Sequence, residues 1–152
     1  MYNFRTDLAS ERREIYQKAN DAKGEIDGIT SEVEDITDKI KVEKVKIINE
    51  SGEKAIGKPI GTYITIDIKD LKIIQEKELQ QAADTITKEL KGMLNEHISH
   101  QGEVLVVGLG NIYVTPDSLG PKVINEIEVT RHIINYMPQY VKEGTRMVSA
   151  IA

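Results

Sequence analysis

Asp117 lies in the stretch of sequence that is best suited to chemistry, Val106–Pro121. It follows Pro116 and comes directly before a segment with helical spacing. The apolar run that opens the stretch predicts a strand, and ligands of open α/β sheets bind outside the carboxyl ends of strands. Asp117 is therefore either a carboxylate that faces such a crevice or the N-cap of the following helix. Ser118 could serve as the cap instead, which would leave Asp117 free for chemistry.

The glycines of this stretch raise the question of a bound nucleotide. Gly108 and Gly110 follow the strand, but the next glycine is Gly120, so the dinucleotide fingerprint lacks its third glycine. The Lys-Ser/Thr pair of a phosphate-binding loop is also missing. His97 and His100 lie three residues apart, and the sequence fixes no third ligand for zinc beside them. We therefore expect neither a cofactor nor a metal.

The elements that position Asp117 follow from the spacing of apolar residues. Residues 103–109 are apolar without alternation, which is typical of a buried parallel strand. Apolar residues recur at helical spacing over 119–134, and the segment 136–138 ends that helix at a proline. Residues 145–152 form another apolar extended run. A helix between two such strands predicts a βαβ unit with a right-handed crossover.

In the first half of the chain, the spacing of apolar residues changes from that of a helix to that of strands. A weak helical pattern covers residues 15–26, and the following segment, 29–38, is acidic and rich in turn formers. Residues 42–49 alternate as a strand does, and 62–68 are β-branched and aromatic. A turn cluster at 49–53 follows the first of these strands. Together these segments predict a β-meander.

The most regular helical pattern covers residues 79–94. Its apolar residues are three or four positions apart, and lysines and glutamates alternate with them on the opposite face. The spacing predicts one amphipathic helix between the meander and the βαβ unit.

Composition limits the kind of protein. The chain has 152 residues, no cysteine and a net charge of −5. It lacks an apolar stretch long enough for a transmembrane helix, and its N-terminus lacks the apolar region of a secretory signal. We expect a soluble, cytoplasmic protein of one domain. The acidic balance disfavours a polyanionic partner such as nucleic acid.

Several motifs resemble those of the germination protease (spore protease) family. The most specific block is Val107–Asn111 followed by Val114–Pro121, and Val129–His132 comes after it. The resemblance covers essentially the whole chain in collinear order. Its other segments are Arg5–Ala9, Ile56–Thr65 and Ser149–Ala152.

The resemblance implies an aspartic-type endopeptidase that degrades the small acid-soluble DNA-binding proteins of bacterial spores during germination, in the spore core. Asp117 matches the first of two catalytic aspartates, and the family's second lies beyond Ala152. The implied fold is an α/β three-layer sandwich with a mostly parallel or mixed central sheet, similar to the hydrogenase-maturation peptidases. Homo-oligomers (tetramers), without direct nucleic-acid or membrane partners, are implied as well. The residues expected to support the loop are Gly108, Gly110, Asn111, Thr115, Pro116 and His132.

The same resemblance implies a zymogen that loses a short N-terminal propeptide. Residues 6–11 resemble the acidic-then-apolar site that the family cuts in its substrates. An enzyme whose leader mimics its substrate can process itself, so we predict cleavage between Asp7 and Leu8. The propeptide would be residues 1–7, and 8–152 the N-terminal part of a single protease domain. Without the resemblance, Asp7 is more simply the cap of a first helix.

Two alternatives to this function stay open. Peptidyl-tRNA hydrolase also has a strand that leads into Val-Gly-Leu-Gly-Asn and a nearby Thr-Arg-His. Here Asn111 and Thr130 are 19 positions apart, and that enzyme needs a basic surface for RNA. A non-catalytic chain that only oligomerises is the other alternative.

The expected peptidase chemistry bears on whether the chain is complete. Because one carboxylate does not act efficiently as both acid and base, we expect this chain to be a catalytically incomplete portion of a longer protein. The apolar run that ends at Ala152 agrees with that expectation.

Overall fold

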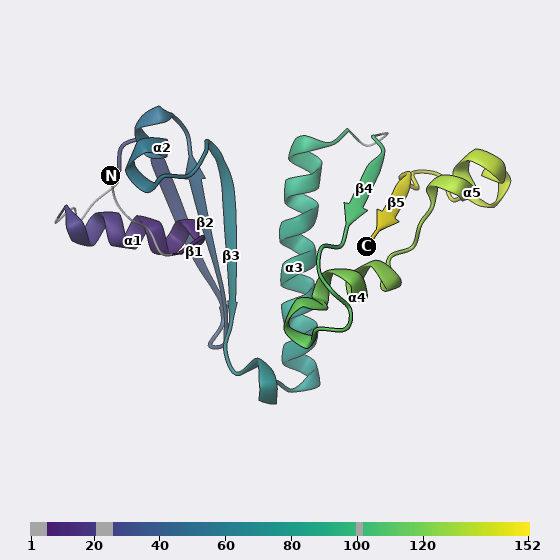
Figure 1. The fold of residues 1–152 in the computed structure, drawn as a ribbon, viewed down its shortest axis with the longest axis horizontal. Coiled ribbons are helices and arrows are strands. Elements are labelled where there is room, and N and C mark those ends of the chain that lie inside the picture. The colour runs from purple at the N-terminus through teal and green to yellow at the C-terminus, as the bar shows by residue number, and fades with distance from the viewer. Residues whose placement is uncertain (1–5, 21–25, 100–101) are drawn as a thin grey trace. The chain divides into compact units, whose positions relative to one another are not determined.

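The computed structural model describes residues 6–20, 26–99 and 102–152. Its chain divides into two units, Met1–Leu90 and Lys91–Ala152. Figure 1 shows the elements of each unit. The predicted boundaries of a propeptide and a single protease domain are not tested by this division and stay a prediction.

The first unit is built on a three-stranded antiparallel sheet in the order β1-β2-β3. Its strands are β1 (Ile29–Thr37), β2 (Ile40–Ile47) and β3 (Gly61–Ile68). The two strands predicted at 42–49 and 62–68 are thereby confirmed, and so is the meander.

The prediction of an acidic, turn-rich segment at 29–38 is wrong, because this segment is strand β1. Two of its three acidic residues lie opposite lysines of β2, Glu32 opposite Lys44 and Asp35 opposite Lys41. Opposite charges directly across two strands stabilise their pairing. These lysines belong to another part of the sequence, so the residues of this segment alone did not indicate a strand.

Helix α2 (Glu50–Ile56) occupies most of the segment predicted as a turn cluster, so that prediction is wrong as well. The Asn49 side chain accepts a hydrogen bond from the Gly52 amide at 3.1 Å and caps the helix. Gly57 ends the helix in the left-handed conformation, at φ 67°. A helix of seven residues is too short to show a periodic apolar pattern.

Helix α1 (Ala9–Ala19) confirms the first helical pattern over part of its predicted length. The predicted pattern continued to Ala22, which lies outside the described residues, and to Ile26, which forms an isolated bridge with Ile29. Together with α2, α1 lies on one side of the sheet (Figure 1). The core between them is a cluster of buried side chains, listed as Ala9, Ile26, Ile29, Val45, Ile47, Ala55 and Ile56.

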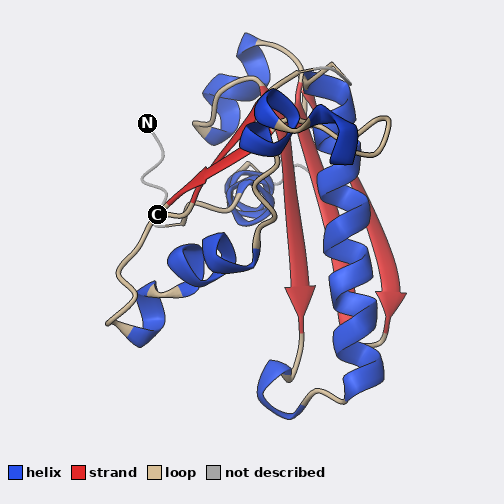
Figure 2. Ribbon diagram, turned by 90° about the vertical axis from the view of Figure 1, so that its right-hand side faces the viewer, coloured by secondary structure: helices blue, strands red, loops and turns tan. Residues whose placement is uncertain are grey.

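Helix α3 (Glu76–His97) confirms the long amphipathic helix. Its first part belongs to the first unit, where Glu89 forms an ion pair with Lys44 of β2 at 2.7 Å. Lys44 lies on the face of β2 opposite the buried Val45, so helices cover both faces of this sheet (Figure 2). The buried residues of α3 are Ala82, Thr85 and Glu89, which are small or polar, and not the large apolar residues of the predicted stripe.

The second unit contains two parallel strands, β4 (Val104–Val107) and β5 (Val148–Ile151). Helices α4 (Leu119–Glu126) and α5 (Arg131–Tyr136) lie between them in the chain. The strand–helix–strand order predicted here is confirmed. The single helix predicted over 119–134 is wrong, because the chain breaks between α4 and α5.

Thr130 explains the break between the two helices. Its hydroxyl donates a hydrogen bond to the Arg146 carbonyl and accepts one from the Val148 amide at 2.9 Å, and its own amide donates to the Val148 carbonyl at 3.1 Å. Thr130 thus fastens the start of α5 to β5. A threonine side chain that bonds to the backbone competes with helix continuation.

The α/β class predicted from the sequence is confirmed, with antiparallel and parallel pairing both present. The strands belong to two sheets, one of three antiparallel strands and one of two parallel strands. In the described part of the chain, none of the helices combines the length and the apolar character needed to cross a membrane.

Candidate functional site

Asp117 is the last residue of a short 3₁₀ turn, η2 (Thr115–Asp117), between β4 and α4. Its amide donates to the Val114 carbonyl at 2.8 Å, and its carbonyl accepts from the Asn111 amide at 3.0 Å. These two backbone bonds fix the main chain on both sides of the residue, while the side chain is exposed. The turn therefore presents the carboxylate to solvent on a backbone that is held in place.

The carboxylate of Asp117 is not the cap of α4. Ser118 occupies the N-cap position, and no side chain caps the helix there. The buried Ser118 hydroxyl instead donates to the Thr115 carbonyl at 3.0 Å. Among the described residues, the Asp117 side chain has no hydrogen-bond or ion-pair partner. Of the two interpretations drawn from the sequence, the helix-cap role is thus not the one that the structure shows.

Three glycines let α4 begin directly against the end of β4. A Cβ on Gly108 would collide with the Gly120 carbonyl, and one on Gly120 would collide with the Leu109 carbonyl. Gly110 has φ 141°, and a Cβ there would collide with the carbonyl of Asp117. Side chains at these positions would push the Asp117 turn away from β4. Sequence reasoning noted Gly120 only as a misplaced member of a nucleotide motif and missed this packing role.

Asn111 closes the loop in front of Asp117. Its side-chain oxygen accepts from the Tyr113 amide at 3.0 Å, and its carbonyl accepts from the Val114 amide at 3.0 Å. Thr115 and Pro116 form the 3₁₀ turn itself. The structure therefore brings five of the predicted loop residues together around Asp117, namely Gly108, Gly110, Asn111, Thr115 and Pro116.

The loop and the start of α4 also expose five large apolar side chains. They flank Asp117 in sequence on both sides, and Tyr113 is 94% exposed. Exposed apolar residues that cluster in this way mark binding surfaces. The group consists of Leu109, Ile112, Tyr113, Val114 and Leu119.

No hydrogen bond or ion pair of the described residues joins His132 to this loop. It is exposed on the first turn of α5, next to Arg131, which forms an exposed ion pair with Glu103 at 3.7 Å. Its attachment to the rest of the unit comes through Thr130 and β5. The predicted supporting role of His132 stays a prediction.

A metal centre does not emerge from the described side chains either. No group of three or more histidines, aspartates or glutamates is close enough there to hold an ion. His97 is the last residue of α3, and His100 lies outside the described residues.

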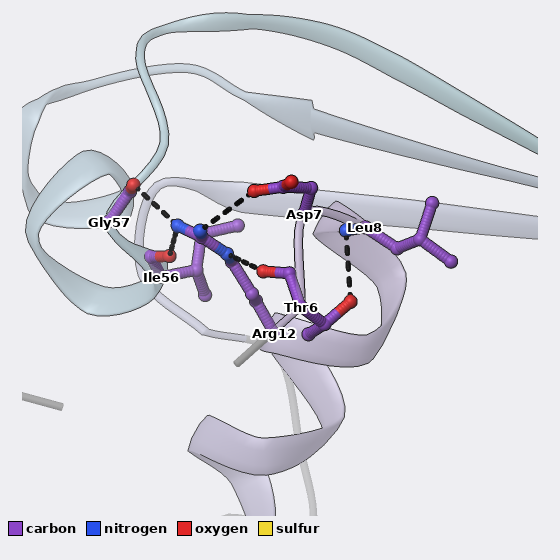
Figure 3. A network of polar contacts seen from close by, with 6 residues as sticks. All are labelled: Thr6, Asp7, Leu8, Arg12, Ile56 and Gly57. Atoms are coloured by element: carbon purple, nitrogen blue, oxygen red, sulfur yellow. Dashed lines mark hydrogen bonds and ion pairs between the residues drawn. The ribbon is translucent and has the colours of Figure 1, made fainter. Parts of the chain in front are cut away.

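The predicted processing bond lies at the start of α1. Leu8 holds the N-cap position, and its amide donates to the Thr6 hydroxyl oxygen at 3.1 Å. Asp7 does not cap the helix; its carboxylate lies 3.6 Å from the Arg12 guanidinium (Figure 3). The cap role considered for Asp7 is therefore not the one that the structure shows.

Comparison with known proteins identifies the family. The family model described as Germination protease matches residues 6–152. The chain belongs to the germination protease family. The resemblance inferred from the sequence is thereby confirmed over nearly the whole chain.

Curated germination proteases of Clostridium species are similar to this chain over nearly all of its length. The chain is 43% identical to that of Clostridium perfringens over all 152 residues, which make up 46% of the relative. It is 43% identical to that of Clostridium tetani over 97% of this chain and 44% of the relative. It is 39% identical to that of Clostridium acetobutylicum over this whole chain and 46% of the relative. The chain thus spans about half the length of the curated relatives it matches.

The loop of this chain carries one acidic side chain, the exposed carboxylate of Asp117. An aspartic peptidase needs two carboxylates that share one proton, because like charges at short range do not both ionise. The loop provides one exposed carboxylate, that of Asp117, on a backbone fixed by hydrogen bonds.

Proposed function

We propose that this chain supplies one half of the catalytic pair of an aspartic-type endopeptidase. The proposed substrates are the small acid-soluble proteins that coat DNA in spores, degraded during germination in the spore core. The observation that carries the proposal is the exposed, unpartnered Asp117 carboxylate, set on a fixed turn beside an apolar surface in a chain of the germination protease family.

The chemistry assigns a role to each carboxylate. The ionised member of the pair takes a proton from water, which attacks the scissile carbonyl, and the protonated member polarises that carbonyl. Asp117 is the only aspartate between residues 91 and 152. We propose that the second aspartate comes from sequence beyond this chain, so that the chain alone does not cleave substrate.

The apolar surface beside Asp117 suits an extended peptide. Leu109, Tyr113 and Leu119 are each more than 70% exposed. An exposed apolar patch gains free energy when side chains of a bound peptide cover it. We propose that it binds the substrate residues next to the scissile bond.

The test measures digestion of a purified small acid-soluble spore protein. We expect no turnover by this chain alone. In a complete germination protease that contains it, Asp117→Asn should lower the rate by about 10²–10⁴-fold, the usual contribution of acid–base groups. The matched control is Glu126→Gln, an exposed carboxylate on α4, which should leave the rate unchanged. Full activity of Asp117→Asn would refute the catalytic role, and Asp117-dependent turnover by this chain alone would refute its incompleteness.

We also propose that the protein is made as a zymogen and processes itself between Asp7 and Leu8. The exposed Asp7 and half-exposed Leu8 provide the acidic-then-apolar pair that the family cuts. Mass spectrometry of the active protein from germinating spores should find Leu8 at the N-terminus. An active form that still begins at Met1 would contradict this processing.

Assembly is the remaining part of the proposal. We propose a homo-oligomer, a tetramer as in the family, without direct nucleic-acid or membrane partners. Sedimentation of the complete protease should give four times the monomer mass, and a monomer with full activity would contradict it. Family membership favours this function over peptidyl-tRNA hydrolase.

A further inference from the structure

The bond proposed for processing is folded into the start of α1. The second and third residues after it, Ala9 and Ser10, are buried at 3% and 5% exposure. Ala9 belongs to the apolar core, and the Ser10 hydroxyl lies 3.4 Å from that of Thr65 in β3. A peptidase that takes its substrate as an extended strand cannot bind these residues while they are helical. The first turn of α1 must open before the bond is cut.

Arg12 holds the chain on both sides of that bond (Figure 3). Its Nε donates to the Thr6 carbonyl at 2.7 Å, and its Nη2 lies 3.6 Å from the Asp7 carboxylate. Its backbone amide donates to the Leu8 carbonyl at 3.1 Å. One residue thus bonds to the leader and to the first residue of the proposed mature chain.

The same guanidinium is anchored at the carboxyl end of α2. Its Nη1 donates to the Gly57 carbonyl at 2.8 Å and to the Ile56 carbonyl at 3.4 Å. The Arg12 side chain is only 15% exposed, and its bond to the Ile56 carbonyl is partly buried, whereas its bond to the Gly57 carbonyl lies at the surface. Arginine suits this position because its planar fork reaches several acceptors at once, whereas lysine offers a single point charge.

We propose that Arg12 is a latch that protects the Asp7–Leu8 bond and sets how fast the leader is removed. The inference rests on the proposed processing at this bond and adds its regulation. Arg12 is a positioning residue, since it acts on the backbone around the bond and not on the reacting atoms of the peptidase.

Release of the leader follows from the same contacts. Hydrolysis adds water across the amide: the hydroxyl joins the Asp7 carbonyl carbon, and a proton joins the Leu8 nitrogen as the C–N bond breaks. At neutral pH the products are the Asp7 carboxylate and the Leu8 ammonium. The Leu8 nitrogen is then no longer covalently bound to Asp7, while Thr6 and Asp7 keep their contacts to Arg12. A positive charge at the start of α1 is also unfavourable there.

Hydrogen exchange tests the latch without using the peptidase activity of the protein. In Arg12→Ala, exchange at the Leu8 amide and in the first turn of α1 should be about tenfold faster, the size expected for lost charge-assisted hydrogen bonds. An added endopeptidase specific for acidic residues should cut after Asp7 faster by a similar factor, as read by mass spectrometry. The matched control is Lys18→Ala, which removes an exposed positive charge from the same helix and should change neither rate.

Equal rates in Arg12→Ala and Lys18→Ala would overturn the latch. If Arg12→Ala also speeds exchange in β2, Arg12→Lys decides instead, because it keeps the positive charge and replaces the planar fork with a single ammonium group. Faster exchange at the Leu8 amide in Arg12→Lys than in Lys18→Ala supports the latch, and equal rates overturn it. An intact leader in active protein from spores would count against processing alone, since exchange does not depend on it.

Discussion

At the scale of single residues, the Lys44–Glu89 pair fastens α3 to the sheet. Glu89 is 6% exposed, and its second oxygen, Oε1, is buried without a partner among the described residues. The hydrogen bond from Lys44 is therefore its main compensation, and it raises the pKa of Lys44, against the opposing effect of burial. A buried carboxylate that loses its cation destabilises a protein strongly.

We expect Lys44→Ala to lower the free energy of unfolding by about 2 kcal/mol, less than for a fully buried pair because water reaches Lys44. Lys88→Ala is the control, since both side chains of the Lys88–Glu34 ion pair, 3.4 Å apart, are exposed. Its loss should lower the free energy of unfolding by less than about 0.5 kcal/mol. Urea unfolding at pH 7 measures both. Because the pKa of Lys44 is raised in the folded state, its stabilisation should persist below its ordinary pKa and fade as the pH rises through the raised value. Equal losses in the two variants would contradict the role of Glu89 burial.

Glu78 gives α3 an acid-sensitive start. Its carboxylate accepts from the Gln75 amide and from Lys39, both at 3.1 Å, and these bonds, the amide first, lower its pKa. The Glu78 carboxylate stabilises the fold fully at a pH above its ordinary pKa. This stabilisation is lost as the pH falls through the lowered pKa of the folded state. Glu78→Gln should therefore be less stable than the parent at pH 7, with a difference that shrinks as the pH falls below the ordinary pKa of a glutamate and through the lowered value. Glu76→Gln, in the same turn, controls for charge at the helix start; an equal pH dependence in both would contradict the bonds as the cause.

At the scale of elements, the glycine contact between β4 and α4 controls where Asp117 lies. Gly120→Ala should destabilise the second unit by about 1–3 kcal/mol, because the added methyl overlaps the Leu109 carbonyl. Gly92→Ala is the control, because Gly92 is an exposed residue of α3 and no atom of the described residues lies within 4 Å of the added Cβ. This variant should raise the free energy of unfolding by up to about 1 kcal/mol, since alanine has the higher helix propensity. Thermal unfolding compares them. A Gly120→Ala variant as stable as the parent would show that the contact is not tight.

Whether an element could be predicted from the sequence depends on where the residues that determine it lie. Strands β2, β3, β4 and β5 and helix α3 have patterns within their own residues, and all were predicted. Strand β1 is paired along its length with β2, helix α2 is capped by Asn49, and Thr130 before α5 bonds to β5. Such partners are distant in sequence, and a single segment does not reveal them.

Part of the candidate site was predictable from the sequence, and part was not. The loop around Asp117 was predictable because its residues all lie within one short segment, 108–117, between β4 and α4. The Arg12 contacts were not, because they join Thr6 and Gly57, 51 positions apart, through one side chain. An arginine within a weakly helical, polar segment looks like an exposed residue.

At the scale of the whole molecule, the apolar core is unevenly distributed between the two units. Every buried alanine, valine and isoleucine of the described residues belongs to the first unit, with Ile40, Val42 and Ile56 at 1% exposure or less. In the second unit, Leu105 and Val107 of β4 are 64% and 52% exposed. A sheet of two strands with exposed apolar residues contributes little stability of its own.

Native-state hydrogen exchange of this chain should therefore show two levels of protection. Amides of β2, which is paired on both sides and buried on both faces, should exchange at least about 100-fold more slowly than those of β4 and β5, since burying a few aliphatic side chains is worth several kcal/mol. The uneven core makes the unit that carries Asp117 the easier one to open, so added urea should expose β4 and β5 amides before those of β2. Equal protection in both sheets, lost together in urea, would mean that the two units unfold as one and that the second is stabilised by more than its own buried side chains.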